Sequence, residues 1–137
     1  HPGIILAGRI VPKKEAARWG MAELMTKVEK DVWQAARIVE KPDPKNAPSN
    51  VAIMSGYILP PEIFAALKST KLGRGKELWL TDAITRLADR FPIYVKMIEG
   101  EYRDTGTKEA WIKTNIAMAL QDQEIGRSIR TYIKTLL

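Results

Sequence analysis

Short apolar runs alternate along this chain with segments in which apolar residues recur at helical spacing. Apolar runs bounded by glycine or proline are typical of buried strands, and four such runs occur at residues 3–11, 35–39, 51–59 and 93–98. The run at 51–59 is almost continuously apolar, which predicts a strand covered on both faces. Residues 21–34 carry a mixed pattern that fits either an insertion helix or a hairpin, and both alternatives stay open.

Four helices are predicted between and after these strands. Thr81 and Thr107 have side chains of the kind that caps a helix, and we expect them to begin the second and third. The predicted buried faces, in chain order, are Ile63, Phe64 and Leu67; Ile84, Leu87 and Ala88; Ile112, Ile116, Ala119 and Leu120; and Ile125, Ile129, Tyr132, Ile133 and Leu136. Strands interleaved with helices predict an α/β sheet.

Length and composition bound the class of protein. The 137 residues suit one domain or part of a larger one, and 45% hydrophobic residues argue against disorder. No apolar run approaches the roughly 20 residues that span a bilayer, so no membrane partner is expected. The absence of cysteine fits a cytoplasmic protein. His1 is the only histidine, which disfavours a histidine base or a zinc site.

The net charge of +6 raises the possibility of a nucleic-acid partner. The basic residues are scattered among 16 carboxylates, however, and the longest basic run is Lys13-Lys14. A dispersed excess is typical of a solvated surface. We therefore expect no nucleic acid, and a phosphorylated metabolite is an equally suitable anionic partner.

Two places in the chain have residues suited to binding a phosphorylated ligand. Glu40 and Lys41 end a predicted strand, where open α/β sheets place their ligands. A carboxylate there can accept hydrogen bonds from sugar hydroxyls, and the ammonium can contact phosphate; the alternative is an ordinary surface turn. Asp104 precedes a helix and can hold Mg²⁺ through oxygen; the alternative is a turn or capping aspartate. Gly20 and Gly56 would allow backbone to approach a ligand closely.

The order of these motifs carries a family resemblance. The segments VEKP, APSNVAIMSGYILPPEIF, GKELWLTDAI and EYRDTGTKEAWIKTNIAMAL follow one another along the chain. In this order they resemble the C-terminal half of UTP–glucose-1-phosphate uridylyltransferases, members of the sugar-phosphate nucleotidylyltransferase superfamily. The resemblance implies that residues 1–137 form the C-terminal, sugar-phosphate-binding portion of a Rossmann-like nucleotidyltransferase domain. Residues 121–137 would be a C-terminal helix.

The resemblance also implies an activity and roles for particular residues. The family makes UDP-glucose and pyrophosphate from UTP and glucose 1-phosphate, with Mg²⁺ as cofactor. Matched by motif, Glu40 would bind glucose hydroxyls, Lys41 the sugar phosphate, and Asp104 the metal. Gly20 would present its backbone to the sugar. Asn50 and Gly56 fall in the segment that forms the family's sugar pocket.

The glycine-rich nucleotide loop of the family is not found in these residues. We therefore expect an N-terminal nucleotide-binding half to be missing, the isolated chain to be inactive, and that half to be a partner. A homo-oligomer is also expected. Thr105 stands where uridylyl enzymes commonly have cysteine or valine, which favours the thymidylyl branch as an alternative. A further alternative is a non-catalytic module that self-associates through its last two helices.

Overall fold

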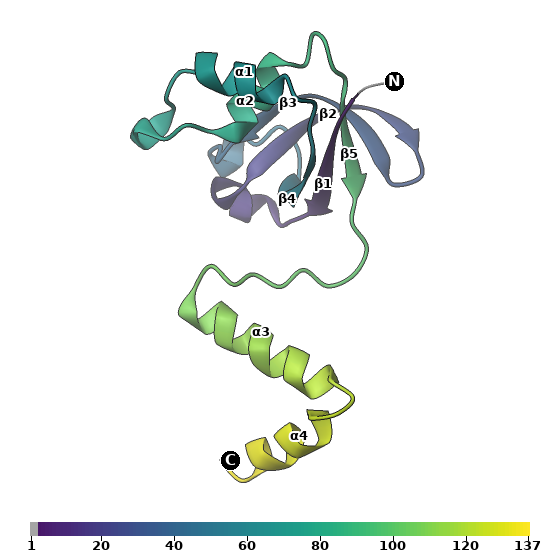
Figure 1. The fold of residues 1–137 in the computed structure, drawn as a ribbon, viewed down its shortest axis with the longest axis vertical. Coiled ribbons are helices and arrows are strands. Elements are labelled where there is room, and N and C mark those ends of the chain that lie inside the picture. The colour runs from purple at the N-terminus through teal and green to yellow at the C-terminus, as the bar shows by residue number, and fades with distance from the viewer. Residues whose placement is uncertain (1–2) are drawn as a thin grey trace. The chain divides into compact units, whose positions relative to one another are not determined.

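The computed structural model describes residues 3–137, apart from the side chain at position 74, so His1 lies outside the described residues. The chain separates into two compact units, His1–Ile98 and Glu99–Leu137. The first unit contains every strand of the described residues, and the second contains two helices (Figure 1).

The first unit is built on a five-stranded mixed sheet that closes on itself (Figure 1). Its strands are β1 (Ile4–Ile10), β2 (Gly20–Glu29), β3 (Val32–Glu40), β4 (Val51–Ile58) and β5 (Ile93–Met97). Neighbours follow the order β1-β4-β2-β3-β5, and β5 returns to pair with β1 in parallel, whereas the other pairs are antiparallel. The predicted α/β class and all four predicted strands are confirmed.

The segment left open at 21–34 forms most of the β2–β3 hairpin rather than a helix. Its two-residue loop places Asp31 at a φ of 60°. Aspartate tolerates this left-handed backbone better than most residues, because its short polar side chain can bond locally. The hairpin sets the register in which Gly20 lies opposite Glu40.

The core lies inside the closed sheet and under the two short helices of this unit. Ile4 and Leu6 point inward from β1 and are fully buried, whereas Ile5 between them is 40% exposed. This alternation of buried and exposed side chains is typical of a strand with one buried face. From the other side, Ile84 of helix α2 (Leu80–Arg86) and Val95 of β5 complete the same cluster.

Two burial predictions in this unit were wrong. The strand at 51–59 is buried only over its first half, and Ile58 is 65% exposed. The exposed half is also the part of β4 that pairs with β1 alone, since β4 pairs with β2 only at Ala52. Phe64 of helix α1 (Ile63–Ser69) is 69% exposed, although its neighbour Ile63 is buried as expected.

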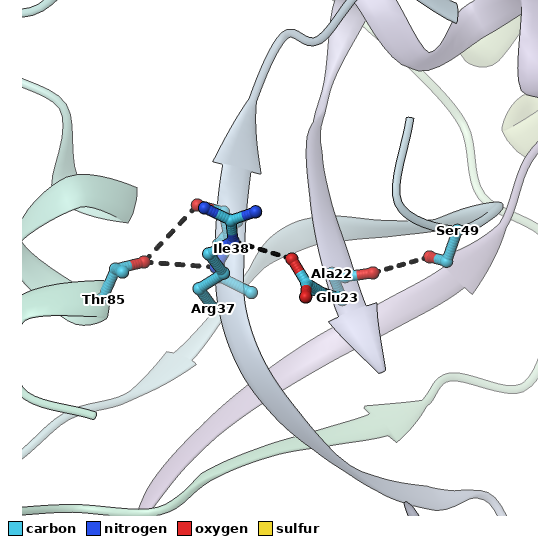
Figure 2. Close-up of polar contacts among 6 residues, drawn as sticks. All are labelled: Ala22, Glu23, Arg37, Ile38, Ser49 and Thr85. Atoms are coloured by element: carbon cyan, nitrogen blue, oxygen red, sulfur yellow. Dashed lines mark hydrogen bonds and ion pairs between the residues drawn. The ribbon is translucent and has the colours of Figure 1, made fainter. Parts of the chain in front are cut away.

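Helix α2 lies against β3 and completes its hydrogen bonding. Strand β5 accompanies β3 only from Val32 to Ala35. Beyond that point the Thr85 hydroxyl accepts a hydrogen bond from Ile38 N at 3.1 Å and donates to Ile38 O at 3.4 Å, as Figure 2 shows. A side chain of α2 thus replaces a neighbouring strand, which satisfies backbone groups that would otherwise lack partners.

The second unit consists of α3 (Lys108–Gln121) and α4 (Gly126–Lys134). The predicted cap at Thr107 is confirmed, since its hydroxyl accepts a hydrogen bond from Ala110 N at 3.1 Å. None of the described side chains of α3 is buried, and Ile112 is 50% exposed, so its predicted buried face was wrong for this structure. The predicted face of the last helix was wrong as well, because Ile125, Tyr132 and Leu136 are exposed, and the helix expected over 121–137 spans only Gly126–Lys134. None of the helices described combines the length and apolar content that a membrane crossing requires.

Candidate functional site

A cleft of ≈ 180 Å³ lies at the open end of the β2–β3 hairpin. Gly20 begins β2 and Glu40 ends β3, and the antiparallel register sets them side by side. The cleft therefore brings together two of the predicted site residues. Its lining residues are Arg18, Trp19, Gly20, Glu40, Ile53, Met54, Ser55, Tyr57 and Thr81.

The carboxylate of Glu40 is the most enclosed charge of this cleft, with 15% of its side chain exposed. Its Oε2 accepts a hydrogen bond from Thr81 Oγ1 at 3.1 Å. Thr81 was predicted to cap a helix, but it lies inside α2, whose N-cap is Trp79. The threonine hydroxyl thus faces the site rather than the end of its own helix.

Gly20 is fitted closely against this carboxylate. A Cβ at this position would lie 3.0 Å from Glu40 Oε2 and 3.1 Å from Thr81 Cγ2. Separations of this size are tighter than ordinary van der Waals contact, so any side chain here would push against Glu40 or Thr81. The prediction that Gly20 presents its backbone to a sugar stays a prediction.

Lys41 follows Glu40 with a φ of 44°, in the left-handed region that lysine rarely adopts. Successive side chains of a regular strand point to opposite faces, whereas this turn ends the alternation. The Lys41 Nζ consequently lies 4.0 Å from Glu40 Oε1. A hydrogen bond from Lys41 N to Trp19 O at 2.9 Å holds the turn in place. Backbone strain of this kind is concentrated at functional sites.

Tyr57 supplies a phenol to the same cleft. Burial raises its pKa above the usual value, and the negative charge of Glu40 raises the pKa further. Both causes disfavour the phenolate, so the hydroxyl keeps its proton and can donate a hydrogen bond at neutral pH. Arg18 lies at the cleft with its Cζ 5.4 Å from the centre of the Trp19 ring. The cleft therefore combines hydroxyl-binding groups with cationic side chains.

The remaining predicted residues of this unit lie elsewhere. Asn50 lines a separate cavity of ≈ 650 Å³ beside Ser49, and its backbone O accepts a hydrogen bond from Val11 N at 2.9 Å. Gly56 is exposed on β4, where a Cβ would lie 2.9 Å from Ala7 Cβ. Neither residue is in the lining of the Glu40 cleft. Their part in sugar binding stays a prediction.

Asp104 belongs to the second unit, where it forms a turn before α3. Its Oδ1 accepts a hydrogen bond from Gly106 N at 2.9 Å, and its backbone O accepts one from Thr114 Oγ1 at 3.2 Å. No cluster of three or more histidine, cysteine or acidic side chains suited to a metal occurs among the described residues. Mg²⁺ commonly uses one or two carboxylates together with substrate phosphates. The role of Asp104 in binding Mg²⁺ stays a prediction.

Sequence reasoning did not identify Thr81 or Tyr57 as site residues. The signal for Thr81 is its spacing of four residues from Thr85, which puts two hydroxyls on one face of α2. Tyr57 directly follows Gly56 in the apolar run, where its ring was interpreted as part of a buried strand. Thr81 reaches Glu40 because α2 packs against β3, and Tyr57 lines the same cleft from β4.

Comparison with known proteins finds one family and several similar structures. A profile of the nucleotidyl transferase family matches residues 2–121. The UTP–glucose-1-phosphate uridylyltransferase of Staphylococcus epidermidis is 39% identical over 126 residues, which cover 92% of this chain and 43% of that protein. The chain thus spans less than half the length of the curated relatives it matches.

Two solved structures are similar in fold. A UDP-glucose pyrophosphorylase complexed with UDP-glucose is 32% identical with a TM-score of 0.81, over 88% of this chain and 45% of that one. The UTP-bound UDP-glucose pyrophosphorylase of Acinetobacter baumannii is 26% identical with a TM-score of 0.83, over 98% of this chain and 46% of that one.

Proposed function

The chain belongs to the nucleotidyl transferase family, and we propose that it provides the sugar-phosphate side of a UTP–glucose-1-phosphate uridylyltransferase site. The observation that carries the proposal is the cleft in which Gly20, Glu40 and Tyr57 meet beside the ammonium of Lys41. Similarity to uridylyltransferases over most of the chain supports the choice of substrate. The remaining part of the relatives' length would supply the nucleotide side.

In this proposal each side chain binds or orients the sugar phosphate. The Glu40 carboxylate accepts hydrogen bonds from glucose hydroxyls, and the protonated Tyr57 phenol can donate one to the same ring. The Lys41 ammonium lies within reach of the 1-phosphate and holds it by charge. When bound, Mg²⁺ would neutralise phosphate charge, with Asp104 as one ligand. Displacement at the α-phosphorus of UTP needs positioning and electrostatics, not a covalent protein nucleophile.

Complementation tests this function directly. The chain would be co-expressed with the N-terminal half of the Staphylococcus epidermidis relative, and UDP-glucose would be measured from UTP and glucose 1-phosphate. We expect product from the pair and none from the chain alone. A pair that folds together but makes no nucleotide sugar from any nucleoside triphosphate would refute the proposal. A preference for dTTP over UTP would instead support the thymidylyl alternative, which Thr105 favours.

The metal role of Asp104 is tested by Asp104→Asn in the complemented enzyme. Asparagine keeps an oxygen for the hydrogen bond from Gly106 N, so the turn should survive while the charge is lost. The Mg²⁺ concentration for half-maximal activity should rise about tenfold, since a charged oxygen ligand is lost. Mg²⁺ titration of the initial rate measures this.

Asp122→Asn is the matched control for this substitution. Asp122 is also an exposed turn aspartate, and its Oδ1 accepts hydrogen bonds from Ile125 N and Glu124 N, which lower its pKa. It precedes α4 and has no proposed contact with the metal. If the activity of the two variants depends on Mg²⁺ concentration in the same way, Asp104 is not a ligand of the metal.

Lys41→Gln should weaken glucose 1-phosphate binding about tenfold, because a charge-assisted contact with phosphate is lost. Glutamine is no better suited than lysine to the left-handed backbone at this position, so the turn is under the same strain in both proteins. Isothermal titration calorimetry gives the affinity. Lys45→Gln is the control, since Lys45 is an exposed lysine of the next turn. Equal affinity in both variants would show that Lys41 does not contact the phosphate.

Self-association through the second unit is part of the proposal. Trp111 of α3 is 55% exposed and Met118 is 61% exposed, and α4 adds Tyr132 at 61%. Exposed apolar side chains of this size favour association with another surface. Sedimentation of the chain would give its oligomeric state. A chain that stays monomeric at all concentrations would exclude self-association through the second unit. A cytoplasmic location stays a prediction.

A further inference from the structure

Two threonines of α2 face β3 from positions one helical turn apart. Thr85 bonds to the backbone of Ile38, as Figure 2 shows, and therefore fastens the helix to the strand. Thr81 donates its hydrogen bond to a side chain instead, at Glu40 Oε2. The same face of one helix thus has one hydroxyl that docks the helix and one that contacts a charged group of the cleft.

Thr81 is buried, so its hydroxyl needs a hydrogen-bond partner within the protein. Its side chain is the one polar side chain that is buried among the described residues, with 7% of the residue exposed. A buried hydroxyl without a partner costs free energy, and within a helix it usually bonds to the carbonyl four residues earlier. Here the acceptor is the carboxylate of the neighbouring strand's last residue.

The carboxylate of Glu40 has one neighbour at each of its oxygens. Thr81 Oγ1 holds Oε2 at 3.1 Å, while Lys41 Nζ stands 4.0 Å from Oε1, longer than a normal hydrogen bond. An ammonium and a carboxylate attract each other, and here the carboxylate side chain is 15% exposed while the lysine side chain is 51% exposed. Without the threonine hydroxyl, the carboxylate would turn toward Lys41 and close the ion pair. The Glu40 carboxylate and the Lys41 ammonium would then bind each other and would no longer be available to a ligand.

We propose that Thr81 is a positioning residue that holds the Glu40 carboxylate apart from Lys41, so that the carboxylate faces sugar hydroxyls and the ammonium faces phosphate. The inference rests on the proposed function, because it takes glucose 1-phosphate as the ligand. The glycine at position 20 supports it, since a Cβ there would lie 3.0 Å from Glu40 Oε2 and 3.1 Å from Thr81 Cγ2 and would displace one of the two groups from this arrangement.

The test compares three variants with the wild type by calorimetric titration with glucose 1-phosphate. Thr81→Val keeps the shape of the side chain and removes the hydroxyl, and we expect about tenfold weaker binding. Thr81→Ser restores a hydroxyl, and its affinity should lie within about twofold of the wild type. Thr85→Val breaks the bonds to Ile38, so it should lower the melting temperature and leave the affinity unchanged.

The outcomes separate this inference from the function on which it rests. Wild-type chain that does not bind glucose 1-phosphate would overturn both. Wild-type binding that Thr81→Val leaves unchanged would overturn the positioning role alone, as would a serine variant as weak as the valine variant. Should Thr81→Val fail to fold, Thr81→Ala makes the same removal with a smaller side chain, and the same comparison with serine decides.

Discussion

Replacing Glu40 by Gln should lower kcat/KM for glucose 1-phosphate about 100-fold in the complemented enzyme, since bonds to a charged group are lost. The carboxylate offers acceptors at both oxygens, one to Thr81 and one to the ligand. An amide has one oxygen and one NH₂, so it keeps one acceptor, loses the other and loses the charge that strengthens both hydrogen bonds. With only 15% of the Glu40 side chain exposed, water cannot easily replace the lost interaction.

Glu23→Gln is the matched control for this substitution. Glu23 lies on the same hairpin and accepts a hydrogen bond from Arg37 Nε at 2.7 Å, at the surface rather than in the cleft (Figure 2). Exposed ion pairs contribute about 0–1 kcal/mol to stability, so activity should stay near the wild type. Equal kinetics for Glu40→Gln and Glu23→Gln would show that the sugar contact is wrongly assigned.

Gly8→Ala should destabilise the first unit by about 3 kcal/mol, the upper range for adding a methyl group to a packed core. Gly8 lies in β1, where an added Cβ would overlap Val95 Cγ1 and lie 3.2 Å from Val51 Cγ1. Both valines are buried and belong to the closed sheet, so neither can move into solvent. Urea unfolding followed by circular dichroism measures the loss.

The clash is tested further by combining Gly8→Ala with Val95→Ala. Val95→Ala alone should destabilise by leaving a cavity, but the methyl group added at position 8 would partly fill it. The double variant should therefore be more stable than the sum of the single changes predicts, with a coupling of about 1–2 kcal/mol. Additive losses would show that the overlap at position 8 is not what costs stability.

The local pattern predicted the elements of the chain well and the burial of their side chains less well. Strand β1 was recognised because its apolar run is bounded by glycine and proline, and the Thr107 cap because threonine precedes a helical repeat. These signals act between residues near in sequence. The exposed half of β4 was missed, because the same apolar letters occur whether or not a second strand covers them.

The sequence by itself determined four of the five strands and the positions of the helices, and it singled out Glu40 and Lys41 as a carboxylate and an ammonium at a strand end. Only the tertiary structure decided what these charges contact. Thr81 meets Glu40 across 41 positions because α2 packs on β3, and the left-handed turn at Lys41 returns its side chain toward Glu40. Periodicity reports how one segment is buried, whereas a contact between distant segments depends on how those segments pack together.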